Sequence, residues 1–216
     1  MAYAVQNRLK KAAGFHIIDA QAPENTVIGI TGGTGCGKTT LLNVIKDQGG
    51  TVLDCDAIYH DLLKTDKALL SAIDSRFPGC VENGVLDRKK LGAIVFANST
   101  ALEDLNKITH TAIKARVQER MAQADGLVAI DAISLFESGL SQLCTTTVAV
   151  LADPKLRVAR LMARDNITEE YAKSRINAQP SNAHFQEICD HTLENNGTAE
   201  NFRENCLAFL QTLGIL

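Results

Sequence analysis

Residues 32–39 combine glycines, a lysine and a threonine at a spacing that suits phosphate binding. They read Gly-Gly-Thr-Gly-Cys-Gly-Lys-Thr and match G-x-x-x-x-G-K-T, the phosphate-binding P-loop. Glycine tolerates positive φ, so the loop can turn its backbone N–H groups inward, and the positive end of the following helix adds to the attraction. This pattern predicts binding of a nucleoside triphosphate. The predicted contacts are Gly33, Thr34, Gly35, Cys36, Gly37, Lys38, Thr39 and Thr40.

Two residues of this loop have distinct predicted roles. The ammonium group of Lys38 is expected to reach the outer phosphates of the nucleotide, and the Thr39 hydroxyl to bind Mg²⁺. The flanking sequence supports the motif over a chance match. Residues 27–30 form a short apolar run typical of a buried strand, and apolar residues at helical spacing over 39–47 predict a helix that stops near Gly49.

A second strand is predicted at Val52 and Leu53, and it ends in Asp54 and Asp56. In open α/β sheets, ligands bind beyond the carboxyl ends of the strands, so these acids are candidates for catalysis or metal binding. One of them can instead cap the helix predicted over residues 57–64. The residues alone leave open which acid caps and which acts.

The remaining elements predict an α/β protein with a five-stranded parallel sheet flanked by helices. Further strands are expected at residues 126–131, 147–151 and 190–193, and a closing helix at 199–213. Residues 65–123 are dominated by helical patterns and are too long for a simple crossover. We therefore expect part of this stretch to be an inserted helical region that holds a substrate. It contains Arg88 and His110, and taken alone these residues are better explained as a surface salt bridge and a helix-surface imidazole.

A pair of helices joined at Asp165 and Asn166 predicts a helical lid over residues 155–180. Its first helix carries Arg157, Arg160 and Arg164. Arginines on a closing lid can neutralise the charge that develops on a transferred phosphoryl group. A solvated basic face is the alternative interpretation of these side chains.

Bulk properties narrow the class of protein. The 216 residues fit a single domain over 27–216, preceded by a leader over 1–26 that is either a docked helix or a frayed tail. A net charge of −3 argues against a broad nucleic-acid surface. We expect no membrane span and no signal peptide, and the six cysteines without a C-x-x-C pair predict reduced thiols in a cytoplasmic protein. The oligomeric state stays open between a monomer and a weak homo-oligomer.

In the order in which these motifs follow one another along the chain, the sequence resembles the dephospho-coenzyme A kinase family. The resemblance extends from residue 27 to about residue 213, and the doubled glycine after Thr31 is typical of the family. The P-loop alone is shared by many families, whereas the ordered set is specific. The matching blocks lie at residues 29–40, 52–58, 84–96, 105–110, 135–137, 160–165, 175–179 and 190–197.

The resemblance implies a P-loop NTPase fold with a helical acceptor-binding insertion and a lid. It implies phosphoryl transfer from ATP, with Mg²⁺, to the ribose 3′-hydroxyl of a small molecule, dephospho-coenzyme A. Asp56 matches the second acid of the family's Asp-x-Asp and is implied to accept the hydroxyl proton, since an alcohol is a poor nucleophile. The other implied site residues are Lys38, Arg160 and Arg164 at the phosphates, Arg88 and His110 on the acceptor side, and Asn195 and Gly197 near the base.

The chain also departs from the family pattern. Thr111 and Ile133-Ser134 stand where the family usually has proline and Pro-Leu, and Phe185 stands near a usual lysine. One alternative is therefore a related small-molecule or nucleoside monophosphate kinase with another acceptor. Another is a nucleotide-binding switch without turnover. A GTPase switch would carry Asn-Lys-x-Asp, and residues 106–109 lack that acid.

Overall fold

The computed structural model describes residues 25–216, so the predicted leader lies outside the described residues apart from Asn25 and Thr26. The Asn25 side chain donates to the carbonyls of Met121 and Ala124, which fixes the entry of the first strand. That strand begins at Thr26, one residue earlier than predicted.

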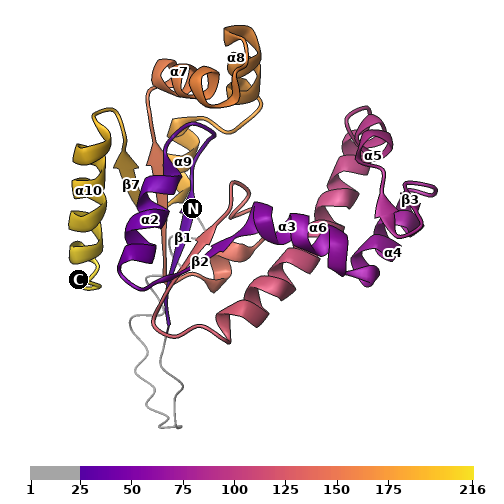
Figure 1. The fold of residues 1–216 in the computed structure, drawn as a ribbon, viewed down its shortest axis with the longest axis horizontal. Coiled ribbons are helices and arrows are strands. Elements are labelled where there is room, and N and C mark those ends of the chain that lie inside the picture. Colours follow the sequence, from indigo (N-terminus) through magenta and orange to yellow (C-terminus); the bar gives the residue numbers. More distant parts are fainter. Residues whose placement is uncertain (1–24) are drawn as a thin grey trace.

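The core is a five-stranded parallel sheet in the order β2-β5-β1-β6-β7, as predicted (Figure 1). All strand carboxyl ends therefore meet at one edge, where the P-loop follows β1 and an aspartate ends both β2 and β5. The strands are β1 (Thr26–Thr31), β2 (Thr51–Asp54), β5 (Leu127–Asp131), β6 (Thr146–Leu151) and β7 (His191–Glu194).

Both faces of the sheet are covered by helices, which explains why the central strands are apolar without alternation. Successive strand residues point to opposite faces, so Val27 packs into one core cluster while Ile28 and Ile30 pack into another. The second cluster lies under α2 (Lys38–Asp47) and α10 (Ala199–Thr212).

The opposite face carries α3 (Cys55–Thr65) and the long helix α6 (Ser99–Met121), which pack together in the first core cluster. The short helix α9 (Asn182–Ile188) covers β6 through Phe185. Phe185 is 1% exposed, so the residue near the family's usual lysine is a core side chain here. A 3₁₀ turn, Leu140–Leu143, precedes β6.

The insertion between β2 and β5 projects to one side of the sheet (Figure 1). Besides α3 and α6, it contains α4 (Lys67–Arg76) and α5 (Arg88–Val95). Between α4 and α5, residues 81–86 form an antiparallel hairpin of β3 (Val81–Glu82) and β4 (Val85–Leu86), which the helical patterns did not indicate. The reason is local: Asn83 and Gly84 both have positive φ, as a tight Asn-Gly hairpin turn requires.

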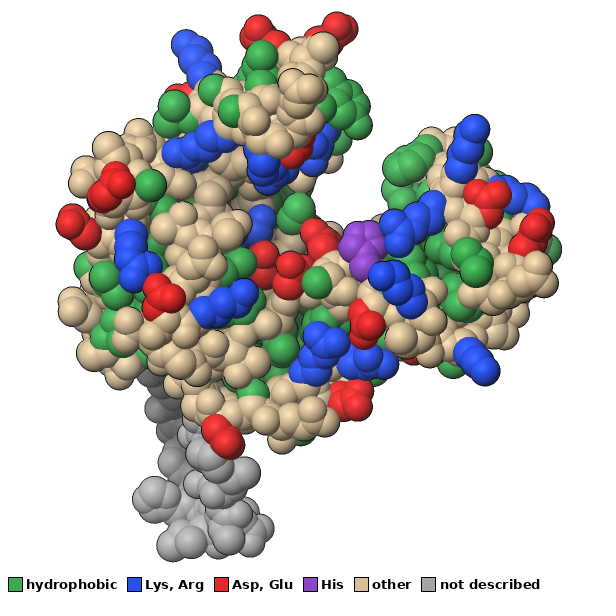
Figure 2. Space-filling model, in the orientation of Figure 1, with side chains coloured by type: hydrophobic (Ala, Val, Ile, Leu, Met, Phe, Trp, Pro, Cys, Tyr) green, Lys and Arg blue, Asp and Glu red, His purple; other side chains and the backbone are tan. Residues whose placement is uncertain are grey.

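The predicted lid consists of α7 (Pro154–Asp165) and α8 (Glu169–Asn177). Figure 2 shows a wide hollow between this pair of helices and the insertion, with charged side chains gathered around its floor and beneath the lid. No helix within residues 25–216 is both long and apolar enough to cross a bilayer.

Candidate active site

The P-loop joins β1 to α2. Gly37 is the N-cap of α2 with φ 93°, and no side chain caps the helix. The first amides of α2 are therefore available to an anion at the positive end of the helix dipole. Gly32, with φ 132°, lies so close to the Val150 carbonyl that a Cβ there would collide with it. The loop backbone can adopt this shape only with glycine at both positions.

Lys38 lies between the loop and an acid that the motif did not identify. Its ammonium donates to the Gly32 carbonyl at 3.0 Å and lies 4.0 Å from Asp131 Oδ1. Asp131 ends β5 and pairs with Ile30 on one side and Asp54 on the other, so it lies between β1 and β2 at the carboxyl edge of the sheet. The rule that pointed to Asp54 and Asp56, an acid at a strand end, also applies to Asp131.

Asp131 has the environment of a cation ligand. Its Oδ1 is buried and has no hydrogen-bond partner among residues 25–216. Burial raises the pKa of this carboxyl to about 6; Asp54 and Asp56 add to the rise, and Lys38 opposes it. A nearby cation would relieve the cost of keeping this carboxylate charged.

The residues present fit a Mg²⁺ ion. Mg²⁺ keeps several waters and takes only one or two protein ligands besides the phosphates. The exposed Thr39 hydroxyl and the Asp131 carboxylate can supply these ligands. Within residues 25–216 no three histidine, cysteine or acidic side chains come together as a metal cluster.

The two acids after β2 have different environments. Asp54 caps α3 by accepting the Ala57 amide at 3.0 Å. Asp56 lies in the first turn of α3 with an exposed side chain. It lines a pocket of about 130 Å³ together with Tyr59 and His110. The structure thus assigns the cap to Asp54 and leaves the Asp56 carboxylate free to face a ligand.

His110 reaches this pocket from α6, across from Asp56. Burial lowers the pKa of its imidazole, and Glu137 opposes that shift. Ile133 and Ser134, where the chain departs from the family pattern, also line the pocket. Thr111 lies within α6 and donates back to the Lys107 carbonyl at 2.8 Å.

Arg88 lies outside the lining of this pocket. Its Nη2 is 3.1 Å from His60 Nδ1, and His60 is one helical turn beyond Asp56 on α3. Asp56 and His110 therefore face one pocket, while Arg88 extends the polar surface away from it. Cys55 also lines the pocket, but burial raises the pKa of its thiol to about 12, so it stays protonated at neutral pH. All six cysteines are free thiols in this structure.

Arg160 and Asn195 donate hydrogen bonds to backbone carbonyls of the P-loop. Arg160 donates to the Asn195 carbonyl at 3.0 Å and to the Gly35 carbonyl at 3.4 Å. Asn195 is buried and donates to the Cys36 carbonyl at 2.9 Å. The Cys36 side chain itself packs in the core. Gly197 follows β7 two residues beyond Asn195, in the turn that leads to α10.

Arg164 is engaged within the lid. It forms a bidentate pair with Asp165 at 2.7 and 3.0 Å, and Arg175 also binds that carboxylate. Hydrogen bonds from Arg164 and Arg175 lower the pKa of Asp165 to about 2. The Arg164 side chain is 60% exposed, so it can exchange this partner for a phosphate without breaking a packed core.

A third arginine of α7, Arg157, is buried against the P-loop. It is 2% exposed, and its Nε donates to the Thr34 carbonyl at 2.9 Å. Its Nη2 donates to Gln179 Oε1, which also accepts the Thr34 amide. The spacing of arginines along α7 marked this residue, but nothing local distinguished it from the half-buried Arg160 and the exposed Arg164.

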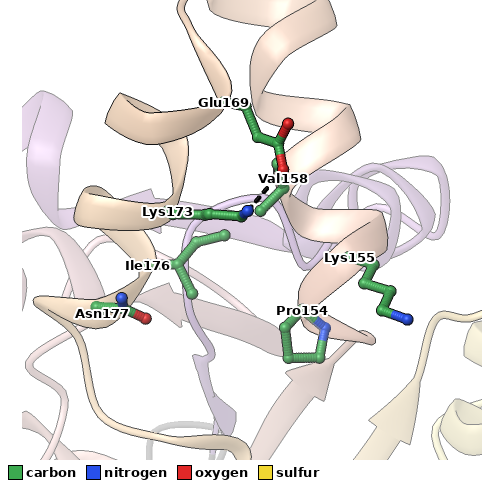
Figure 3. Close-up of a pocket in the computed structure, with 7 residues that line it drawn as sticks. All are labelled: Pro154, Lys155, Val158, Glu169, Lys173, Ile176 and Asn177. Atoms are coloured by element: carbon green, nitrogen blue, oxygen red, sulfur yellow. Dashed lines mark ion pairs between the residues drawn. The ribbon is translucent and has the colours of Figure 1, made fainter.

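A larger pocket of about 460 Å³ lies between α7 and α8, away from this chemistry (Figure 3). Its lining is largely aliphatic, and an ion pair of 2.6 Å joins Lys173 and Glu169 at its rim. None of the residues that line it belongs to the P-loop or carries a predicted catalytic role.

Comparison with known proteins identifies the family of the chain. A family model described as dephospho-CoA kinase matches residues 26–201. The dephospho-CoA kinase of Geobacillus kaustophilus (strain HTA426) is 36% identical over 193 residues, which cover 85% of this chain and 94% of that protein.

Solved structures share the fold. A Thermus thermophilus protein superposes with a TM-score of 0.74 and 30% identity, covering 88% of this chain and 98% of that one. The dephospho-CoA kinase from Campylobacter jejuni gives a TM-score of 0.62 and 27% identity, covering 88% and 97%. These likenesses confirm the predicted P-loop kinase fold. Since the family model matches well over half of the chain, and a relative above 30% identity covers most of it, the chain belongs to the dephospho-CoA kinase family.

Proposed function

We propose that the protein transfers the γ-phosphoryl group of ATP to the ribose 3′-hydroxyl of dephospho-coenzyme A, giving coenzyme A and ADP. The observation that carries this proposal is the position of Asp56. Its exposed carboxylate faces a pocket at the sheet edge that also carries the P-loop. A kinase needs a carboxylate that faces the acceptor site, whereas a nucleotide switch without turnover has no use for one.

The reaction divides between the two sides of this edge. The hydroxyl oxygen attacks the γ-phosphorus, its proton passes to Asp56, and the bond from that phosphorus to the β,γ-bridging oxygen breaks, so that ADP leaves. Lys38 and the amides at the start of α2 hold the phosphates. Lys38 would exchange the Gly32 carbonyl for a phosphate oxygen, since its present hydrogen bond is to a neutral acceptor.

Thr39 and Asp131 would hold Mg²⁺ beside those phosphates. The ion would supply positive charge to the bridging region during transfer. The unpartnered Oδ1 of Asp131 and the exposed Thr39 support this assignment.

The lid and the insertion would complete the site. Arg164 would leave Asp165 for the transferring phosphoryl group as the lid closes, a change its exposure permits. Arg160, Asn195 and Gly197 would border the nucleotide on the side of the base. On the acceptor side, His110 would contact the ribose within the pocket, and Arg88 would meet a more distant phosphate of the acceptor.

A coupled ADP-release assay with ATP, Mg²⁺ and dephospho-coenzyme A tests the proposal. We expect ADP release to require the acceptor. It should fall about 10²–10⁴-fold in Asp56→Asn, because the general base is lost. Nucleotide affinity, measured by titration calorimetry, should stay unchanged, because the substitution leaves the nucleotide site in place.

A panel of nucleoside monophosphates and other small alcohols serves as the comparison. Release of ADP with one of these compounds, but not with dephospho-coenzyme A, would show that the acceptor is a different molecule. Ile133 and Ser134, which depart from the family pattern and line the pocket, would then be the first residues to examine for the changed specificity. Unchanged turnover in Asp56→Asn would remove Asp56 from the base role.

A further inference from the structure

Arg157 is a buried cation without a carboxylate partner. It is 2% exposed, and among residues 25–216 none of the ion pairs involves it. Its guanidinium donates to two neutral oxygens, the Thr34 carbonyl at 2.9 Å and Gln179 Oε1 at 3.1 Å. Burial of an unpaired charge is costly, and such charges in proteins are usually paired or bound to a ligand of opposite charge.

The guanidinium lies against the outer turn of the P-loop. A Cβ on Gly33 would collide with Arg157 Nη2, and one on Gly35 would come within 3.0 Å of the Arg157 carbonyl. Gln179, after the last turn of α8, accepts both Arg157 and the Thr34 amide through the same oxygen, the latter at 2.8 Å. The lid and the P-loop are therefore joined by a three-residue clamp of Arg157, Gln179 and Thr34.

We propose that Arg157 is a positioning residue for the nucleotide: it fixes the outer turn of the P-loop, and the phosphates of the bound nucleotide supply the negative charge that its buried guanidinium lacks. Arg157 acts through the loop and through its field, since its hydrogen bonds are made to the loop carbonyl and to Gln179. The inference rests on the proposed use of ATP and adds a residue that the motif did not include.

This role predicts a trade between stability and affinity. Replacement of a buried, unpaired charge by a neutral group is often neutral or stabilising for the ligand-free protein. The same replacement removes attraction for phosphate in a region of low dielectric, where charges act strongly. The effect should therefore grow with the charge of the ligand, from adenosine through ADP to ATP.

Two substitutions change the charge by different routes. Arg157→Gln removes the cation. Gln179→Glu keeps an acceptor for both hydrogen bonds and gives Arg157 a buried carboxylate partner. For each we expect the Kd for ATP to rise roughly tenfold, the Kd for ADP to rise less and that for adenosine to stay unchanged. The melting temperature of the ligand-free protein should be unchanged or higher.

Two controls define the role of charge. Arg157→Lys keeps the positive charge and should retain most of the affinity for ATP. Arg203→Gln removes a surface arginine that pairs with Asp47 at 2.9 Å, and it should change no nucleotide affinity. Titration calorimetry and thermal denaturation without nucleotide measure both quantities without relying on turnover.

Several outcomes would overturn the inference while leaving the proposed function intact. These are wild-type affinity for ATP in Gln179→Glu, an equal loss for ATP and adenosine, or an equal loss in Arg157→Lys and Arg157→Gln. A lower melting temperature in both charge-changing variants would indicate a purely structural clamp. If the wild-type protein binds no ATP, the proposed function fails and this inference fails with it.

Discussion

Replacement of Asp131 by asparagine should stabilise the ligand-free protein at neutral pH while impairing its reaction. Asp131 is 17% exposed at its side chain, and burial raises its pKa from 3.8 to about 6. A carboxyl whose pKa is higher in the folded state binds its proton more tightly there. The folded state therefore loses stability as the pH rises from about 4 to 6, and the cost is complete above that range.

The magnitude follows from the shift. A rise of this size corresponds to about 3 kcal/mol of unfolding free energy at pH 7.5, because each unit is worth ~1.36 kcal/mol. Asparagine has nearly the same shape and carries no charge, so it resembles the protonated acid. The variant and the wild type should have the same free energy of unfolding near pH 3.5, and the variant should be more stable at pH 7.5. For a chain of this size the gain corresponds to roughly 6–12 °C in melting temperature.

Urea denaturation between pH 3.5 and 7.5, without nucleotide or metal, measures this difference. Asp125→Asn is a suitable control, since Asp125 is exposed and lies two residues before the same strand. Added Mg²⁺ and ATP should stabilise the wild type more than Asp131→Asn, and turnover of the variant should fall. A variant no more stable than wild type at pH 7.5, or a gap that persists at pH 3.5, would refute the reasoning.

Three further substitutions test separate parts of the molecule. Lys38→Ala should lower turnover on the order of a hundredfold or more in the coupled assay, because the phosphates lose their nearest cation; a smaller effect than in Arg203→Ala would contradict this. Arg88→Ala should raise the KM for the acceptor roughly tenfold and leave that for ATP unchanged, and an effect on ATP alone would move Arg88 to the other side of the site. Phe185→Ala should cost about 3–5 kcal/mol in urea denaturation, since its ring is buried under α9, and a loss below 1 kcal/mol would show that the site collapses to fill the cavity.

The strands and the P-loop could be predicted because their signals are local. Apolar runs set the strand positions to within a residue or two, and the loop's glycines and lysine lie within eight residues. The Asn83-Gly84 hairpin also had a local signal, but two-residue strands are too short to interrupt the helical pattern around them.

The choice between Asp54 and Asp56 needed the structure. Both follow the same strand, and only the hydrogen bond from Ala57 to Asp54 separates the capping acid from the one that faces the pocket. Likewise, one pocket brings together Asp56 of α3 and His110 of α6, two residues that lie more than fifty positions apart in the chain.

The sequence by itself determined the α/β architecture, the P-loop and the family resemblance, because periodicity and contiguous motifs depend on near neighbours. Only the tertiary structure decided which charges are buried and what they contact. Asp131 meets Lys38 through the parallel register of β1 and β5, and Arg157 is buried while Arg164, on the same helix, is exposed. Burial and the distance between charges set pKa values and electrostatic energies, and both depend on residues that lie far apart in the chain.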